Sequence, residues 1–252
     1  MKALITGASS GIGSDMARIL ANTYDELVLV GRNKERLNDL KKELESSNNV
    51  KIKTISIDLS DYNNCIKIYE ENKDIDLLIN DAGFGDYGKF INTDLEKDIK
   101  MIETNVIALH TLTKLYLIDM KKKNKGHILN VASIAGFMPG PLMTTYYATK
   151  NYVVRLSEGI REELRKDKSK VHISILCPGP VSTSFEKTAN VKFQFPGVDS
   201  YNIAKYAIDH LDKFYIVPGI GTKISRILMQ ILPGSLTAKI MYILQSTRKQ
   251  NK

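Results

Sequence analysis

Residues 2–13 read KALITGASSGIG: a short apolar run, a turn with three glycines, and the start of a helical pattern. The run Lys2–Thr6 has the length and composition of a buried strand. Glycines permit a tight turn and let backbone N–H groups approach an anion closely. The positive end of the following helix points at the same place. The stretch therefore predicts a strand–turn–helix unit that binds the pyrophosphate of a dinucleotide.

The alternation of strand and helix in this first unit repeats along the chain. Six more β-rich runs follow: Glu26–Gly31, Val50–Ile57, Ile75–Asn80, Gly126–Ser133, Val171–Pro178 and Phe214–Val217. Most are continuous apolar runs, as expected for strands covered on both faces. Amphipathic segments such as 33–47 and 95–123 lie between them. The pattern predicts an α/β fold with a doubly wound parallel sheet of the Rossmann type, of about seven strands.

Composition indicates a globular chain of 252 residues, 43% apolar and 25% charged. No run approaches the roughly 20 apolar residues of a spanning helix, and the start MKALIT lacks the pattern of a signal peptide. Cys65 and Cys177 have no metal-ligand spacing and fit reduced thiols. We therefore expect a cytoplasmic protein without a metal site. Zinc spacings and aromatic–basic signatures are missing, so no nucleic-acid partner is expected.

Most of the net charge of +8 lies in the C-terminal part of the sequence. From Lys213 onward there are seven lysines and arginines and no aspartate or glutamate. We expect one dinucleotide-binding and catalytic domain over residues 1–218 and a basic amphipathic extension over 219–252, in two helical pieces divided at Pro233-Gly234. Three interpretations of the extension stay open: a packed element or subunit contact, an in-plane anchor on the inner face of an anionic membrane, or a disordered tail.

A tyrosine and a lysine one helical turn apart occur in TTYYATKNYVV, residues 144–154. Tyr146 and Lys150 share one face of a helix, whereas Tyr147 breaks this spacing and is expected to pack in the core. A phenol has a pKa of about 10, and a nearby ammonium favours its ionised form. Lowering that pKa to about 7 requires roughly 4 kcal/mol, and one charge pair about 4 Å apart supplies about 1 to 4 kcal/mol. The lysine together with a positively charged oxidised nicotinamide can reach that sum, whereas a surface pair in water could not, so the spacing predicts an activated phenol.

The spacing of the first turn, T-G-x-x-x-G-x-G, resembles that of the short-chain dehydrogenase/reductase family, over Lys2 to about Val217. Three further motifs at strand ends are similar to the family's: Asp58-Leu59 for the adenine, NDAG (80–83), and PGPVST (178–183) on the nicotinamide side. The resemblance implies a cofactor site formed by Thr6, Gly7, Ser9, Ser10, Gly11, Ile12, Gly13, Arg32, Asp58, Leu59, Asn80, Ala82, Gly83, Tyr146, Lys150, Pro178, Gly179, Val181 and Thr183.

The resemblance also implies catalytic roles for four side chains. Tyr146 exchanges a proton with the substrate oxygen, and Lys150 lowers its pKa and bonds the nicotinamide ribose. Ser133, thirteen residues before Tyr146, donates to the same oxygen. Asn105 holds a water that links the lysine to solvent, although Ala108 stands where the family has glycine. The implied reaction is hydride transfer between a nicotinamide cofactor and a carbonyl or secondary alcohol.

Two positions bear on cofactor choice and affinity. Arg32 follows the second strand where a carboxylate would hold the ribose diol of NAD. Its planar cation suits a 2′-phosphate, so NADP(H) is favoured over NAD(H), although Ser10 stands where many NADP-using relatives have a basic residue. Asp81 replaces the second asparagine of the family's NNAG element and cannot donate an amide N–H. We expect local rearrangement or weaker cofactor affinity from it.

The segment after residue 183 carries Phe185, Phe193 and Phe195 and is expected to cover the substrate. Its aromatic side chains favour a lipophilic ketone, acyl or steroid-like. The alternative is a catalytically weak NADPH-binding protein that regulates a partner, against which the intact set of Ser133, Tyr146 and Lys150 argues. The resemblance also implies a homo-oligomer, a dimer or tetramer.

Overall fold

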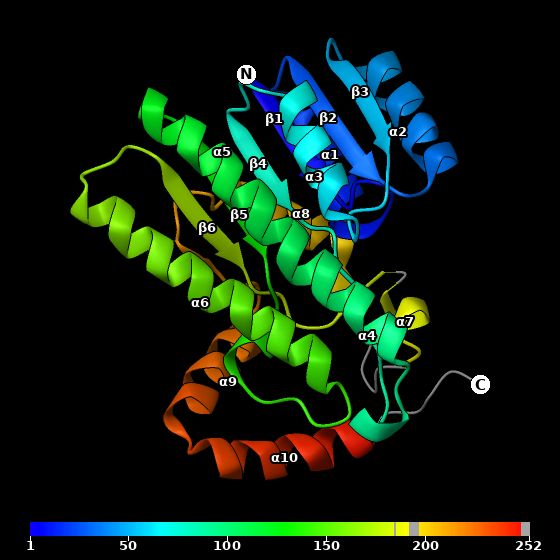
Figure 1. Cartoon of the computed structure of the whole chain (residues 1–252), viewed down its shortest axis with the longest axis vertical. Coiled ribbons are helices and arrows are strands. Elements are labelled where there is room, and N and C mark those ends of the chain that lie inside the picture. Colours follow the sequence, from blue (N-terminus) through cyan, green and yellow to red (C-terminus); the bar gives the residue numbers. More distant parts are fainter. Residues whose placement is uncertain (184, 192–196, 248–252) are drawn as a thin grey trace.

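Figure 1 presents a computed structural model of the chain, which describes residues 1–183, 185–191 and 197–247. Within these residues seven parallel strands form one sheet: β1 (Lys2–Thr6), β2 (Glu26–Gly31), β3 (Lys51–Ser56), β4 (Leu77–Asn80), β5 (His127–Val131), β6 (His172–Leu176) and β9 (Tyr215–Ile216). Their order is β3-β2-β1-β4-β5-β6-β9, so the chain winds outward in both directions from the junction of β1 and β4. This confirms the predicted doubly wound parallel sheet.

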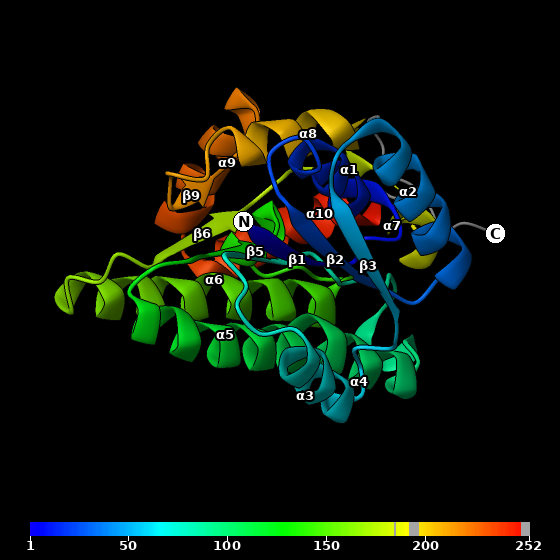
Figure 2. The same ribbon diagram turned by 90° about the horizontal axis from the view of Figure 1, so that it is seen from above.

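Helices cover both faces of the sheet, as Figure 2 shows. One layer holds α1 (Gly11–Leu20), α2 (Lys34–Ser47) and α8 (Ser200–Ile208), and the other holds α3 (Tyr62–Glu71), α5 (Leu109–Lys123) and α6 (Thr144–Lys166). Successive strand residues enter opposite cores: Leu4 packs with the α3–α5–α6 layer, and Ile5 packs with the α1–α2–α8 layer. Both faces being buried explains why the strands are apolar at nearly every position.

The predicted helical segment 95–123 contains a wide turn that its periodicity did not reveal. It consists of α4 (Leu95–Ile102), a π-helical turn η2 (Glu103–Ala108) and α5. Short π-helical pieces inside α-helices are rare and occur mostly at functional sites. Asn105 lies in this turn, and its side chain is buried.

Two helices follow the last strand, α9 (Ile220–Ile231) and α10 (Gly234–Ser246), with the predicted break at Pro233. They lie beyond the carboxyl ends of the strands (Figure 1). The guanidinium of Arg226 lies 3.6 Å from the ring centroid of Tyr215, and the Tyr87 hydroxyl donates a 2.9 Å hydrogen bond to the backbone oxygen of Gln245. The interpretation of a disordered tail is therefore wrong for residues 220–246.

Smaller elements complete the carboxyl edge. They are the 3₁₀ turns η1 (Phe90–Asn92) and η3 (Ile134–Phe137), the helix α7 (Phe185–Thr188), and the two-stranded sheet of β7 (Val181–Ser182) and β8 (Val198–Asp199). Within the described ranges, no helix combines the length and the apolar character that crossing a membrane requires.

Candidate active site

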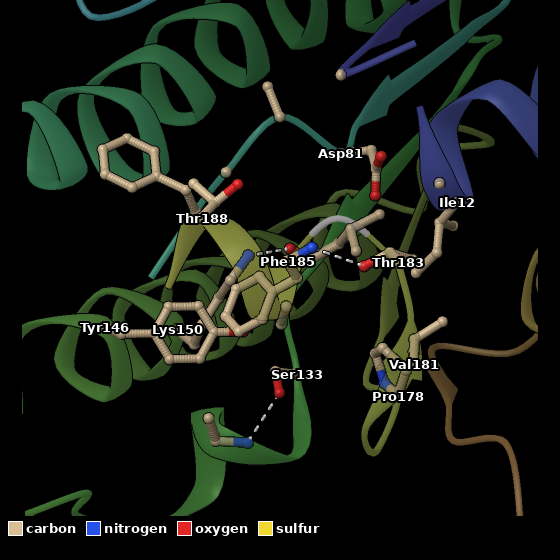
Figure 3. A pocket seen from close by; sticks show the side chains of 18 of the residues that line it. Ile12, Asp81, Ser133, Tyr146, Lys150, Pro178, Val181, Thr183, Phe185 and Thr188 are labelled. Atoms are coloured by element: carbon tan, nitrogen blue, oxygen red, sulfur yellow. Dashed lines mark hydrogen bonds between the residues drawn. The ribbon is translucent and has the colours of Figure 1, made fainter. Parts of the chain in front are cut away.

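A cavity of about 430 Å³ lies at the carboxyl edge of the sheet, where the loops after β1 to β6 converge (Figure 3). This is the edge where ligands bind in doubly wound sheets. Most of the residues that the sequence singled out line it: Gly7, Ser9, Ser10, Gly11, Ile12, Arg32, Asp58, Leu59, Ala82, Gly83, Ser133, Tyr146, Lys150, Pro178, Gly179, Val181 and Thr183.

The glycine-rich turn is locked against the end of β4. Gly7 has φ +73°, and a Cβ there would lie 2.9 Å from the backbone nitrogen of Ala82. A Cβ on Gly13 would lie 2.7 Å from Oδ2 of Asp81. The buried hydroxyl of Thr6 accepts hydrogen bonds of 3.1 Å from the N–H groups of both Asp81 and Ala82. Thr6 and Gly13 thus support the turn from behind the cavity and do not line it.

Asn80 is also a supporting residue. It is buried, and its Nδ2 donates to Oδ1 of Asn130 at 2.9 Å and to the hydroxyl of Thr113 at 3.0 Å. These bonds join the end of β4 to β5 and to α5. Asn80 therefore holds the strands whose loops carry the site, and its side chain lies outside the cavity wall.

Tyr146 and Lys150 lie together on the cavity side of α6, as their spacing predicts (Figure 3). The Lys150 Nζ lies 5.9 Å from the centroid of the Tyr146 ring and donates a 2.8 Å hydrogen bond to the carbonyl oxygen of Val131. An ammonium this close to the ring favours the ionised form of the phenol. Tyr147 is buried in the core against Gly140, and part of it reaches the cavity wall.

The Lys150 amine is buried, and burial lowers its pKa to about 8, while the nearby Asp81 carboxylate raises it. Burial raises the pKa of Asp81 to about 7, against the effects of Lys150 and of the Gly13 N–H that bonds the carboxylate. Lys150 therefore keeps its positive charge at neutral pH. The Asp81 carboxyl therefore changes from neutral to negatively charged as the pH rises through about 7.

Asn105 fixes the loop that passes under the lysine. Its amide forms a pair of hydrogen bonds with the backbone of Phe84, donating to the oxygen at 2.8 Å and accepting from the nitrogen at 3.0 Å, and it donates to the hydroxyl of Thr149 at 3.1 Å. A Cβ on Gly83 would lie 2.9 Å from Asn105 Oδ1 and 3.5 Å from Lys150 Nζ. Gly83 therefore permits the close approach of these two side chains.

Ser133 follows β5 and caps the turn η3. Its hydroxyl accepts a 3.2 Å hydrogen bond from the N–H of Ala135 and lines the cavity (Figure 3). Because that bond uses a lone pair, the hydroxyl proton can be donated into the cavity. A serine donor, a phenol and a buried ammonium thus line the same cavity as the glycine-rich turn and Arg32. This arrangement fits an elongated nucleotide with anionic groups at the turn.

Comparison with known proteins agrees with this geometry. The family model of the short chain dehydrogenases matches residues 1–212. The chain belongs to this family. Its members are oxidoreductases, so this dehydrogenase is an oxidoreductase with a nucleotide cofactor.

Individual relatives cover most of the chain. The mouse very-long-chain 3-oxoacyl-CoA reductase is 30% identical over 94% of this chain and 74% of its own length. A short-chain dehydrogenase from Sphingobium yanoikuyae in complex with NADPH has a TM-score of 0.81 and 28% identity, over 92% of this chain and 96% of its own. A Burkholderia phymatum relative in complex with NAD has a TM-score of 0.82 and 23% identity, over 90% and 92%, and shows the shared fold.

The sequence did not reveal the apolar part of the cavity wall. It is formed by side chains from the loop before α6 and from the two C-terminal helices: Met138, Met143, Met229, Met241 and Leu244. No local motif marks them, because they meet only after α9 and α10 fold back over the sheet edge. Phe185 reaches the cavity as expected, with its ring centroid 5.2 Å from that of Tyr146. Phe193 and Phe195 lie outside the described residues.

Asp81 is the departure from the family pattern with the clearest consequence. Its backbone N–H donates a 3.1 Å hydrogen bond to the hydroxyl of Thr6, and local rearrangement around it stays a prediction. Weaker cofactor affinity stays a prediction, with a pH dependence that follows from the raised pKa of about 7. The carboxyl is mostly neutral at pH 6 and mostly charged at pH 8. When charged, the carboxylate repels an anionic cofactor in the same cavity.

We expect Asp81→Asn to bind NADPH about 2- to 10-fold more tightly than wild type at pH 8, since one screened repulsion is worth on the order of 1 kcal/mol. The two proteins should bind equally at pH 6. Fluorescence titration at both pH values measures this. Glu70→Gln, which removes an exposed carboxylate from α3, should behave as wild type. Equal affinities of Asp81→Asn and wild type at pH 8 would contradict the prediction.

Proposed function

We propose that this dehydrogenase reduces a lipophilic carbonyl compound, of acyl or steroid-like type, with NADPH as its hydride source. One observation carries the proposal. The polar group of Ser133, Tyr146 and Lys150 shares a single cavity with an apolar wall of methionine, leucine and phenylalanine side chains. A substrate with one carbonyl and a long apolar body matches both parts of such a cavity.

The bound cofactor supplies the hydride, and the chain's own residues handle the proton. The Ser133 hydroxyl donates to the carbonyl oxygen as negative charge develops there. The Tyr146 phenol gives its proton to the same oxygen. The ammonium of Lys150 favours the resulting phenolate, because it is held at fixed distance by the carbonyl of Val131. Asn105 would hold a water that joins the lysine to a proton path; both Asn105 Oδ1 and Lys150 Nζ lie close to Gly83, which supports this role.

Two findings support a lipophilic substrate. The described part of the segment after β7 places Phe185 and Thr188 on the cavity, and α9 and α10 add Met229, Met241 and Leu244. The mouse relative is named a very-long-chain 3-oxoacyl-CoA reductase, a name that describes a carbonyl substrate with a long acyl chain. An apolar wall of this kind offers no partners for the hydroxyls of a sugar.

The choice of NADP(H) as the cofactor rests on Arg32. Its exposed guanidinium lines the cavity beside Ser9 and Ser10, and among the described residues no carboxylate forms an ion pair with it. It is therefore available for the 2′-phosphate. The Sphingobium relative binds NADPH, in agreement with this choice.

We also propose that the protein is cytoplasmic and forms a dimer or tetramer. The buried free thiols of Cys65 and Cys177 support the location, and the family resemblance supports the assembly. The alternative, a regulatory protein that binds NADPH and turns over weakly, leaves the convergence of Ser133, Tyr146 and Lys150 unexplained. A turnover assay separates the two.

We expect wild type to oxidise NADPH, followed by absorbance, with one or more members of a panel of long-chain 3-oxoacyl esters and steroid ketones. Tyr146→Phe should lose at least about 10²-fold in kcat, because it removes the general acid, and should retain NADPH binding. Tyr152→Phe, on the same helix and bonded to His110, should remain active. Near-normal turnover by Tyr146→Phe would contradict the mechanism, and inactivity of wild type on the whole panel would favour the regulatory alternative.

We expect Arg32→Asp to lower the ratio of kcat/KM with NADPH to kcat/KM with NADH by about 10- to 100-fold, because it replaces a phosphate partner with a charge that repels phosphate. Arg36→Asp, at an exposed position of α2 outside the cavity wall, is the matched control. An unchanged ratio in Arg32→Asp would refute the assignment.

A further inference from the structure

The outer side of α9 is a stripe of exposed apolar side chains. Its members are between 52% and 78% exposed: Ile220, Ile224, Ile227, Leu228 and Ile231. Single exposed apolar residues are ordinary on protein surfaces, whereas a contiguous set of five on one helix indicates an interaction surface.

The position of the stripe follows from helix geometry. Each residue advances the helix by about 100°, so positions 220, 224, 227, 228 and 231 fall within about 100° of one another. Ser225 and Met229, which line the cavity, fall on the opposite side. α9 therefore has a cavity-facing side and an apolar outer side, with Lys223 at the edge of the stripe.

α10 repeats this arrangement. Leu236, Ile243 and Leu244 are exposed, while Met241 and Gln245 are buried on the inner side. Lys239 lies three residues after Leu236, as Lys223 lies three residues after Ile220. Both helices lie at the same end of the molecule, beyond the carboxyl ends of the strands (Figures 1 and 2). We call these exposed side chains and the two lysines the α9–α10 face.

The charged residues of the C-terminal segment itself all have one sign. Residues 219–252 contain six lysines and arginines, among them Lys223 and Lys239 on the face, and no aspartate or glutamate. A two-fold contact with a second copy would bring these like charges together. An anionic lipid surface complements them and accepts the isoleucines between its headgroups, which is the composition of helices that lie in a membrane plane.

We propose that the α9–α10 face docks on an anionic membrane surface, with α9 and α10 lying in the plane of the headgroups. Leu244 belongs both to this face and to the cavity wall. Docking would therefore bring one wall of the cavity to the bilayer surface. Membrane docking does not depend on which carbonyl compound the protein reduces. It can therefore be tested by vesicle binding, without a substrate.

The test is co-sedimentation of the full chain with vesicles of phosphatidylcholine alone or of equal parts phosphatidylcholine and phosphatidylglycerol. We expect wild type to pellet with the anionic vesicles, more weakly at high salt, and much less with the neutral ones. Ile227→Glu/Ile231→Glu, whose positions lie outside the cavity wall, should weaken binding about 10- to 100-fold. Lys223→Glu/Lys239→Glu should lose the preference for anionic lipid.

Tyr62→Glu is the matched control, because Tyr62 is a similarly exposed apolar residue on the distant helix α3. It should bind vesicles as wild type does, and NADPH titration should show that every variant is folded. Absence of wild-type binding to anionic vesicles would overturn the proposal, as would equal binding by Ile227→Glu/Ile231→Glu. Light scattering tests whether the face instead binds a second copy of the chain. If wild type does not bind vesicles but forms an oligomer, and Ile227→Glu/Ile231→Glu dissociates that oligomer, the face is a subunit contact.

Discussion

The buried amine of Lys150 on α6 donates a hydrogen bond to the carbonyl oxygen of Val131, and this bond fixes the end of the helix that carries Tyr146 against the sheet. Val131 is the last residue of β5, so the bond places the ammonium at the carboxyl edge where the cavity opens. Tyr146, one turn earlier on α6, is carried to the same edge. The position of the phenol is therefore set by the packing of α6 on β5, and the chemistry of the site depends on that packing.

Burying an ammonium destabilises its charged form, and the surroundings of Lys150 compensate for this. Besides the Val131 carbonyl, the Asp81 carboxylate raises the pKa of the amine, which burial alone would lower further. Asp81 in turn is bonded by the N–H of Gly13 in the cofactor-binding turn. The glycine-rich turn, the end of β4 and α6 are thereby coupled electrostatically through Asp81.

Much of this could be predicted from local sequence. Strand ends, the glycine-rich turn and the four-residue step from Tyr146 to Lys150 are short-range patterns, so their positions in the fold followed from the strand order. Residues that act across the chain could not be found in this way. Asn80 meets Asn130, fifty residues away, and the tail supplies Met241 and Leu244 to the cavity. The π-helical turn was hidden because one wide turn leaves helical periodicity almost unchanged.

In the proposed mechanism, the charge of Lys150 makes the Tyr146 phenol an effective proton donor near neutral pH. The most direct test of this mechanism is the pH dependence of kcat/KM for carbonyl reduction in wild type and in Lys150→Met, which keeps the length and buried packing of the side chain. We expect activity to fall as the phenol ionises, and we expect the midpoint of this fall to lie at least about one pH unit higher in Lys150→Met, since one pKa unit corresponds to about 1.4 kcal/mol. The same midpoint in both proteins would contradict the mechanism.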